Sequence, residues 1–242
     1  MAEPEKREDL NDAVEDAFGF NFRSLKTLRD LFVRPNAVFA AYAARDRVTY
    51  TPALRLWFGL IGLQVLVSAL WGGWEGLLTR QIESGDPTTR ASFEQMAGGN
   101  LDAFIGHYAA AASVLQPIIV ALFTSLSVFV LGWFRPQLSW PSRLNIAMAV
   151  LVAGSVMGLL LMPMLAMPAM ASWAWLSMAL VAFVYFITVL RGAPGVLADT
   201  AAGVWGKSAI YTIVLMLLVV LSGMVLAIVG VIYAVVMMSA AA

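Results

Sequence analysis

Residue types that carry out chemistry are scarce in this chain. It contains no cysteine and a single histidine, His107, among 242 residues. Without thiols it has no disulfide, thiolate metal site or cysteine nucleophile, and one imidazole supplies neither a metal site nor a catalytic triad. Asp102 lies little more than one helical turn before His107. We therefore expect His107 to form interfacial hydrogen bonds, with a proton-linked role as the alternative.

One segment resembles a phosphate-binding loop but lacks its essential parts. Residues 201–208 read Ala-Ala-Gly-Val-Trp-Gly-Lys-Ser. A true loop of this kind begins with Gly and follows a β-strand, whereas a long apolar run follows here. We expect no nucleotide site, and we expect Lys207 to hold the end of that run.

A group of methionines around Pro163 and Pro168 has the soft thioether ligands that Cu(I) prefers. Its members are Met162, Met164, Met167 and Met170. The chain contains 13 methionines and uses them as apolar filler, so a simple turn is the favoured interpretation. The sequence thus predicts no metal, no cofactor and no catalytic residue, and we expect a protein that is not an enzyme.

Three amide side chains stand out inside apolar runs: Gln64, Gln116 and Asn145. Ion and proton carriers usually keep ionisable residues in such runs, and here Arg55, near the start of its run, is the only one. Pro117 frees a backbone carbonyl beside Gln116. The three amides are a candidate intramembrane polar groove, and a kinked helix whose amide bonds a neighbour is the alternative.

The runs that carry these amides are too apolar for a soluble core. The chain is 61% hydrophobic and 12% charged, with a mean hydropathy of +0.82. A bilayer core of about 30 Å needs about 20 helical residues. We predict an all-α integral membrane protein with a bundle of five transmembrane helices preceded by an amphipathic interfacial helix. The transmembrane domain covers residues 52–242, with spans at about 52–74, 108–134, 144–162, 170–190 and 209–238.

The distribution of positive charge predicts the orientation. Lys and Arg near span ends stay on the cytoplasmic side. Only Arg80 and Arg90, of 15 such residues, fall on the side opposite to the N-terminus. We therefore expect a cytoplasmic N-terminus and an external C-terminus. All eight tryptophans lie near predicted span ends, where the headgroup level favours indole rings.

Ahead of the first span we expect an acidic cytoplasmic tail over residues 1–20 and an amphipathic interfacial segment over residues 21–51. Side chains after Ser24 divide between two helical faces, so a helix lying in the membrane surface is predicted. The apolar face comprises Leu25, Leu28, Leu31 and Phe32, and the polar face comprises Lys26, Arg29 and Asp30. The candidate basic residues for contact with lipid or a partner are Lys26, Arg29, Arg34, Arg45 and Arg47. A segment that only sets the angle of the first span is the alternative.

Small residues indicate where helices approach closely. Gly154 and Gly158 form a GxxxG pair in the third span, and Gly223 with Ala227 is a weaker pair in the fifth. These pairs either seal the five helices together or face a partner. The segment 75–106, between the first two spans, is a solvated connector, a lid or a docking loop.

The leader also carries a family resemblance. Leu28-Arg-Asp-Leu-Phe-Val-Arg-Pro35, Tyr42 and Arg47-Val-Thr-Tyr50-Thr-Pro52, ahead of five apolar runs, resemble bacterial relatives of the Yip family of Ypt-interacting five-helix membrane proteins. They also resemble a bacterial membrane domain of unknown function. The resemblance covers about residues 20–240. It implies a bacterial inner-membrane protein with five spans, a cytosolic N-terminus and an external C-terminus. Eukaryotic Yip members act in vesicle traffic with Rab-type GTPases, but their Asp-Leu-Tyr-Gly-Pro signature is absent from this chain.

These observations favour a non-catalytic membrane adaptor or assembly subunit. We expect it to bind membrane lipids and another membrane protein or a second copy of itself, but neither nucleic acid nor nucleotide. The alternative is a carrier or scramblase that moves a lipid or other amphiphile along the groove of Gln64, Gln116 and Asn145.

Overall fold

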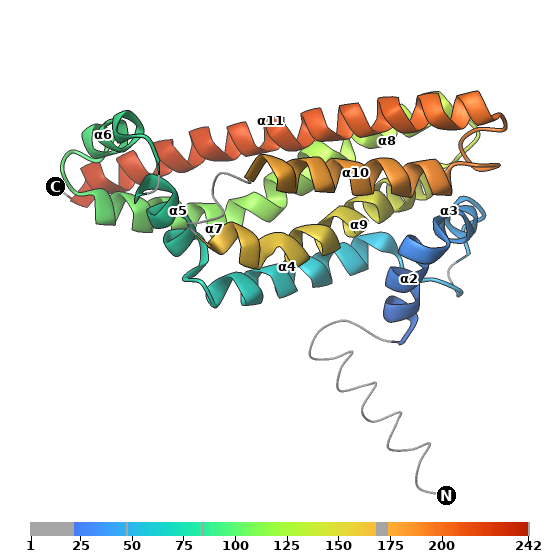
Figure 1. Cartoon of the computed structure of the whole chain (residues 1–242), viewed down its shortest axis with the longest axis horizontal. Helices are drawn as coiled ribbons and strands as arrows, with labels where there is room; N and C mark the ends of the chain where they lie inside the picture. The colour runs from blue at the N-terminus through green and yellow to red at the C-terminus, as the bar shows by residue number, and fades with distance from the viewer. Residues whose placement is uncertain (1–21, 47, 84, 168–173, 242) are drawn as a thin grey trace, which may run out of the picture.

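The computed structural model describes residues 22–46, 48–83, 85–167 and 174–241, and within these ranges it is all-helical, as the sequence predicts (Figure 1). The helices are α2 (Phe22–Val33), α3 (Pro35–Ala43), α4 (Ala53–Ala69), α5 (Gly73–Glu83), α6 (Pro87–Met96), α7 (Leu101–Ser125), α8 (Ser127–Phe134), α9 (Trp140–Ala166), α10 (Ala174–Gly192) and α11 (Ala201–Ala241). Among the described residues, four helical stretches are long and apolar enough to cross a membrane, and a bent helix pair makes up to five.

The bent pair replaces the first predicted span. α4 contains 17 residues and ends at Ala69, and α5 then departs at 59° rather than continuing the helix through Trp74. Gly72 and Gly73 have φ values of 78° and 60°, a left-handed conformation that glycine adopts without steric cost. At about 1.5 Å per residue, α4 alone is about 26 Å long, slightly less than a bilayer core.

The other predicted spans lie within longer helices. The span predicted at 108–134 is divided between α7 and α8, which meet at Leu126, and Pro117 lies inside α7 without ending it. The spans predicted at 144–162 and 209–238 fall inside α9 and α11. The span predicted at 170–190 is described only from α10 onward, since residues 168–173 lie outside the described residues.

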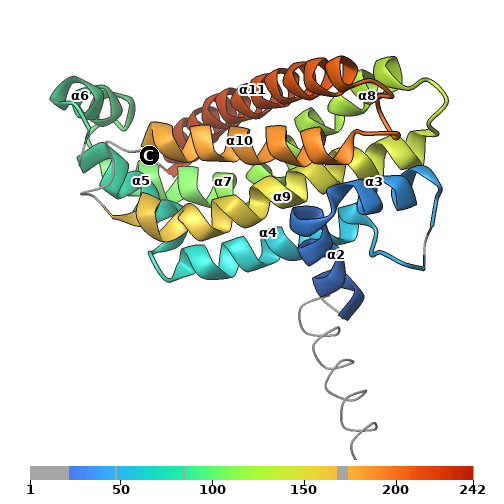
Figure 2. The ribbon, with the colours of Figure 1, turned by 45° about the vertical axis from the view of Figure 1, so that its right-hand side comes forward.

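α9 is the central helix of the bundle. Every residue from Ile146 to Ala153 is buried, and α9 packs against α4 on one side and α10 on the other. Figure 2 shows this order, with α2 and α3 folded against the ends of α9 and α10. We name this end of the molecule the basic end, because Arg135, Arg191 and Lys207 lie there with α2 and α3.

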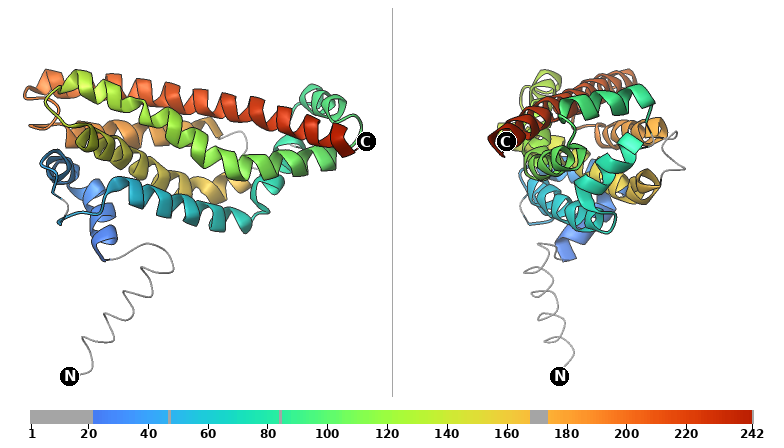
Figure 3. Two further views of the ribbon diagram at one scale, coloured as in Figure 1. Left: turned by 180° about the vertical axis from the view of Figure 1, so that it is seen from behind. Right: turned by 90° about the vertical axis from the view of Figure 1, so that its left-hand side faces the viewer.

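α7 and α11 pack along each other and continue past the ends of α4, α9 and α10 (Figures 1 and 3). With 41 residues, α11 is about 60 Å long. We name the far part of the molecule the extension: α5, α6, residues 101–113 of α7 and residues 228–241 of α11. A separate small core of Ala97, Phe104 and Ala234 holds it together.

Candidate functional site

A buried carboxylate fixes α2 at the basic end. The Asp30 side chain has no exposed surface, and its Oδ2 accepts hydrogen bonds from the Tyr50 hydroxyl at 3.0 Å and from Arg34 Nη2 at 3.1 Å. Burial raises the pKa of this carboxyl, but the hydrogen bonds from Tyr50 and Arg34 outweigh that effect and hold the pKa below its usual value. The ionised carboxylate is therefore the form that joins α2 to the segment before α4.

Hydroxyl groups extend this junction to Thr51. The Thr51 backbone N–H donates to Thr27 Oγ1 at 3.0 Å, and the Thr51 and Ser24 hydroxyls lie 3.3 Å apart. The Tyr42 hydroxyl donates to the Thr51 carbonyl at 2.5 Å. Four residues of the leader thus lie in one buried polar network: Asp30, Tyr42, Tyr50 and Thr51. Its geometry fixes the chain where it enters α4.

The α2–α3 pair is also bound to the end of α10. Arg191 donates from Nη1 to the Phe32 carbonyl at 2.7 Å and from Nη2 to the Val33 carbonyl at 2.6 Å, which satisfies carbonyls that the end of α2 leaves open. Asn36 Nδ2 donates to the carbonyls of Gly192 and Pro194 at 3.2 and 2.6 Å. These contacts span more than 150 residues of sequence.

These contacts correct the predicted faces of α2. Leu31, expected on the membrane face, and Asp30, expected on the polar face, are both buried against the bundle. The outward surface of α2 combines cations with apolar side chains. It comprises Phe22, Leu25, Lys26, Arg29, Phe32 and Val33. Tertiary hydrogen bonds, rather than solvent, satisfy the polar residues of the inner face, so helical periodicity alone assigned them to the wrong side.

The candidate basic residues remain at this end. Lys26 Nζ lies 5.2 Å from the centre of the Tyr50 ring, and Arg29 is exposed. Arg34 pairs with Asp30 across one helical turn. Arg45 Nε donates to Ser139 Oγ at 2.9 Å. Arg47 lies outside the described residues.

The structure brings together two of the three candidate groove amides. Gln64 and Gln116 line one cavity of about 300 Å³ between α4, α5, α7 and α9, and Gln64 Nε2 donates to the Ser155 carbonyl at 3.0 Å. Asn145 is not part of this groove. Its Oδ1 accepts from the Ala53 backbone N–H at 3.1 Å, so it caps the start of α4 at the basic end.

The small-residue pairs differ in what they contact. A Cβ at Gly154 would overlap the Tyr185 ring, so this glycine lets α9 and α10 approach closely. A Cβ at Gly158 would lie 3.6 Å from Gln64 Nε2, so this glycine faces Gln64. Within the described residues nothing lies within 4 Å of a Cβ at Gly223, so this glycine does not pack against another helix of the chain, and its facing a partner stays a prediction. Ala227 lines a cavity in the extension.

Two further close glycine contacts escaped sequence reasoning. A Cβ at Gly192 would meet the Phe39 ring at 2.5 Å, and one at Gly230 would meet the Tyr108 ring at 2.7 Å. Neither glycine was singled out, although Gly230 and Ala234 have the same spacing as Gly223 and Ala227. An aromatic partner distant in sequence leaves no periodic signal.

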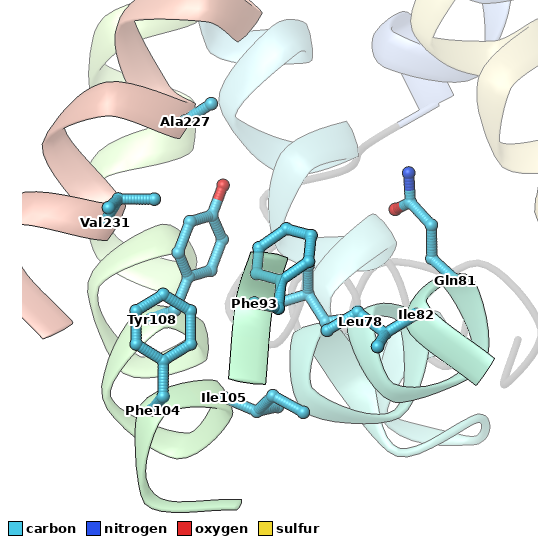
Figure 4. Close-up of a pocket in the computed structure, with 9 residues that line it drawn as sticks. All are labelled: Leu78, Gln81, Ile82, Phe93, Phe104, Ile105, Tyr108, Ala227 and Val231. Carbon is cyan, nitrogen blue, oxygen red and sulfur yellow. The ribbon is translucent and has the colours of Figure 1, made fainter. Parts of the chain in front are cut away.

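The cavity in the extension has a volume of about 220 Å³ and is mainly apolar (Figure 4). Its walls come from α5, α6, α7 and α11, and Phe104 and Tyr108 lie side by side on its α7 wall. The segment 75–106 therefore includes most of α5 and all of α6, which surround this cavity together with α7 and α11. It forms more than an extended connector, although a docking role for it remains a prediction.

Lys207 has the structural contacts expected of it. Its Nζ donates to the Phe134 and Leu197 carbonyls at 2.8 and 2.6 Å. The surrounding residues 201–208 are the first two turns of α11 and form no loop. Lys207 therefore joins α11 to the end of α8 and to the connection after α10.

No protein-family profile, curated protein or solved structure matches this chain.

Proposed function

We propose that this chain is a five-span integral membrane protein of the bacterial inner membrane, with its basic end at the cytoplasmic face and the extension outside. Four long apolar helices support the membrane assignment, with α4 of the bent α4–α5 pair as the fifth crossing. The concentration of Lys and Arg at one end supports the orientation.

The level of the bilayer follows from charges at the basic end. Arg135 forms an ion pair with Asp199 at 2.6 Å, and Lys207 lies one to two turns into α11, so the inner interface belongs at this level. About 20 residues cross about 30 Å of hydrocarbon, so α11 leaves the outer side of the core near Ala227. Asp102 and His107 on α7 then fall outside the core, where polar side chains are well solvated.

An exposed apolar stripe runs along the whole of α11. Its side chains recur at helical spacing and comprise Ile210, Ile213, Leu217, Leu221, Met224, Ile228, Ile232 and Val236. Lipid tails cover the part within the core, but Ile228, Ile232 and Val236 project beyond it and remain more than half exposed. Apolar surface outside the membrane is a mark of protein contact. This outer stripe carries the proposal of a non-catalytic adaptor or assembly subunit.

Thiol crosslinking tests the adaptor proposal directly, because the natural chain contains no cysteine. Ile232→Cys and Val236→Cys place single thiols on the outer stripe, and Ala234→Cys, at a fully buried position, is the matched control. We expect discrete crosslinked products from the first two variants in native membranes. Crosslinking of the purified, reconstituted chain then distinguishes a second copy from another protein. If both thiols react freely with a water-soluble maleimide and no crosslinked product forms, the result contradicts the proposal.

The cavity shared by Gln64 and Gln116 favours a second candidate, a carrier or scramblase for a lipid or other amphiphile. For such a carrier, Gln116→Leu should abolish movement of a fluorescent lipid between leaflets of reconstituted vesicles. Gln95→Leu, which removes an exposed amide on α6, is the control. Equal flux in both variants would exclude this pathway.

A further inference from the structure

We propose that a cavity at the basic end binds the phosphate group of an anionic phospholipid from the cytoplasmic leaflet. The cavity has a volume of about 370 Å³ and lies between α2, the segment joining α3 to α4, and the start of α9. We name it the basic-end cavity. The inference rests on the proposed membrane placement of this end, but not on the partner proposed for α11.

The position of the cavity matches the headgroup level. Pro52, directly before α4, and Pro141, in the first turn of α9, both line it. Helices that cross the bilayer therefore start at its rim, where lipid phosphates lie under the proposed placement. At about 30 Å³ per water molecule, the volume equals about a dozen waters, which is ample for a phosphodiester group.

Cations outnumber acids around this cavity. Arg23 and Arg45 line it, and Lys26 lies over the Tyr50 ring in its wall. Asp46 is the one acid in the lining, and its Oδ1 accepts the backbone N–H groups of Val48 and Thr49. The excess positive charge favours an anion, and guanidinium groups match the geometry of phosphate oxygens.

Neutral polar groups in the wall are already paired with other groups of the protein. The Tyr42 hydroxyl donates to Thr51, the Tyr50 hydroxyl donates to Asp30, and Asn145 Nδ2 donates to Pro141 at 3.0 Å. Within the described residues, Arg45 uses Nε for Ser139 and leaves its two terminal amino groups without a partner. Those amino groups are hydrogen-bond donors that the cavity offers, and Arg23 adds a positive charge to its wall.

The backbone of Arg45 has an unfavourable conformation that the surrounding structure holds in place. Its φ is 60°, a left-handed conformation that among the described residues every other example assigns to glycine. A non-glycine residue in this region is held against its preference by the surrounding structure. Here the Asp46 turn and the bond to Ser139 hold it, and they place its guanidinium in the cavity wall.

Native mass spectrometry of the full chain in mild detergent tests the inference. The probes are phosphatidylglycerol, zwitterionic phosphatidylcholine and inorganic phosphate. We expect the natural chain to retain phosphatidylglycerol selectively. Arg45→Gln should weaken that retention about tenfold, as expected for a lost charge-assisted hydrogen bond, and Arg23→Gln should weaken it because it removes a positive charge from the cavity wall. The matched control is Arg29→Gln, which removes an exposed arginine from the same helix outside the cavity lining.

Each outcome has a distinct meaning. Equal loss in Arg29→Gln and both cavity variants reveals general surface attraction and overturns the inference. Displacement of bound phosphatidylglycerol by equimolar inorganic phosphate assigns the site to a soluble phosphate and overturns the lipid source. The two cavity variants alter different elements, so each gives an independent result if the other fails to fold. Failure of this test together with crosslinking at Ile232 rejects the lipid site alone.

Discussion

The basic end and the extension hold their short helices in place with different kinds of contact. In each, two short helices fold against the ends of longer ones. α2 and α3 are held by a buried carboxylate, hydroxyl pairs and carbonyl-binding Arg191 and Asn36. α5 and α6 pack through apolar side chains that leave a cavity of about 220 Å³. Hydrogen bonds are directional and apolar contacts are not. The basic end should therefore hold one geometry, whereas the extension can adjust its packing.

Two ion pairs with the same one-turn spacing give the largest expected contrast. Asp30–Arg34 has a fully buried acid, whereas Arg90–Glu94 on α6 has both side chains about half exposed. We expect Asp30→Ala to cost about 2–3 kcal/mol, because the Tyr50 hydroxyl loses its buried acceptor. Glu94→Ala should cost at most about 0.5 kcal/mol. Reversible unfolding in mixed detergent measures both, and equal costs would remove the contrast.

Two close glycine contacts sharpen it further. Gly192→Ala should cost about 1–3 kcal/mol, because the Phe39 ring that its methyl meets is fully enclosed. Gly230→Ala should cost less than about 1 kcal/mol, since the Tyr108 ring borders the cavity and can shift into it. Hydrogen exchange of α3 and α6 peptides reports each effect locally. A larger cost for Gly230→Ala would show that the extension is the stiffer region.

Acid should reproduce part of the Asp30→Ala effect. The pKa of Asp30 in the folded chain lies below its ordinary value of 3.8, which the unfolded chain retains. At pH values between the two pKa values, the unfolded chain therefore binds more protons. Stability from this group is complete above pH 3.8 and is lost as pH falls through the folded pKa. Under those conditions we expect the amides of α2 to be less protected from hydrogen exchange, relative to their intrinsic rates. Asp30→Asn should show no such additional loss of protection. Hydrogen bonds from Thr88 also lower the pKa of exposed Asp86, but Asp86 caps only α6, so its protonation should fray that helix start.

Filling the cavity should give the smallest effect, with the opposite sign. Ala227→Val adds two methyl carbons at the cavity wall and should raise the free energy of unfolding by about 0.5–1 kcal/mol. Ala202→Val, the same change at an exposed position of the same helix, is the control with no expected gain. Thermal unfolding in detergent measures both. A loss of stability in Ala227→Val would mean that the cavity walls cannot accept added volume.

Hydropathy was sufficient to predict the helical class and the approximate positions of the long helices, because those depend on local composition. The break after Ala69 was missed since Trp71 and Trp74 kept the window apolar while Gly72 and Gly73 turned the chain. Asn145 was misassigned because hydropathy does not show that its Oδ1 accepts the Ala53 backbone N–H, a contact across 92 residues of sequence.

The buried polar network around Asp30 and the basic-end cavity both depend on contacts that no local sequence pattern encodes. Asp30 meets Tyr50 across 20 residues, and Arg191 meets Phe32 across 159. Arg23 was overlooked because it belongs to no spaced pattern, and only the fold places it in the same cavity wall as Arg45. Gln64 and Gln116 were found because an amide in an apolar run is conspicuous wherever the helices pack.

α11 gives the molecule a mechanical link between its two faces. Lys207 fastens one end of this helix, and no proline interrupts it through Ala241. Pivoting such a rod by about 10° at the fastened end would swing its tip sideways by about 10 Å over a length of about 60 Å. A change in how lipid or protein engages the basic end would then displace the tip of α11 in the extension, with α7 carried alongside.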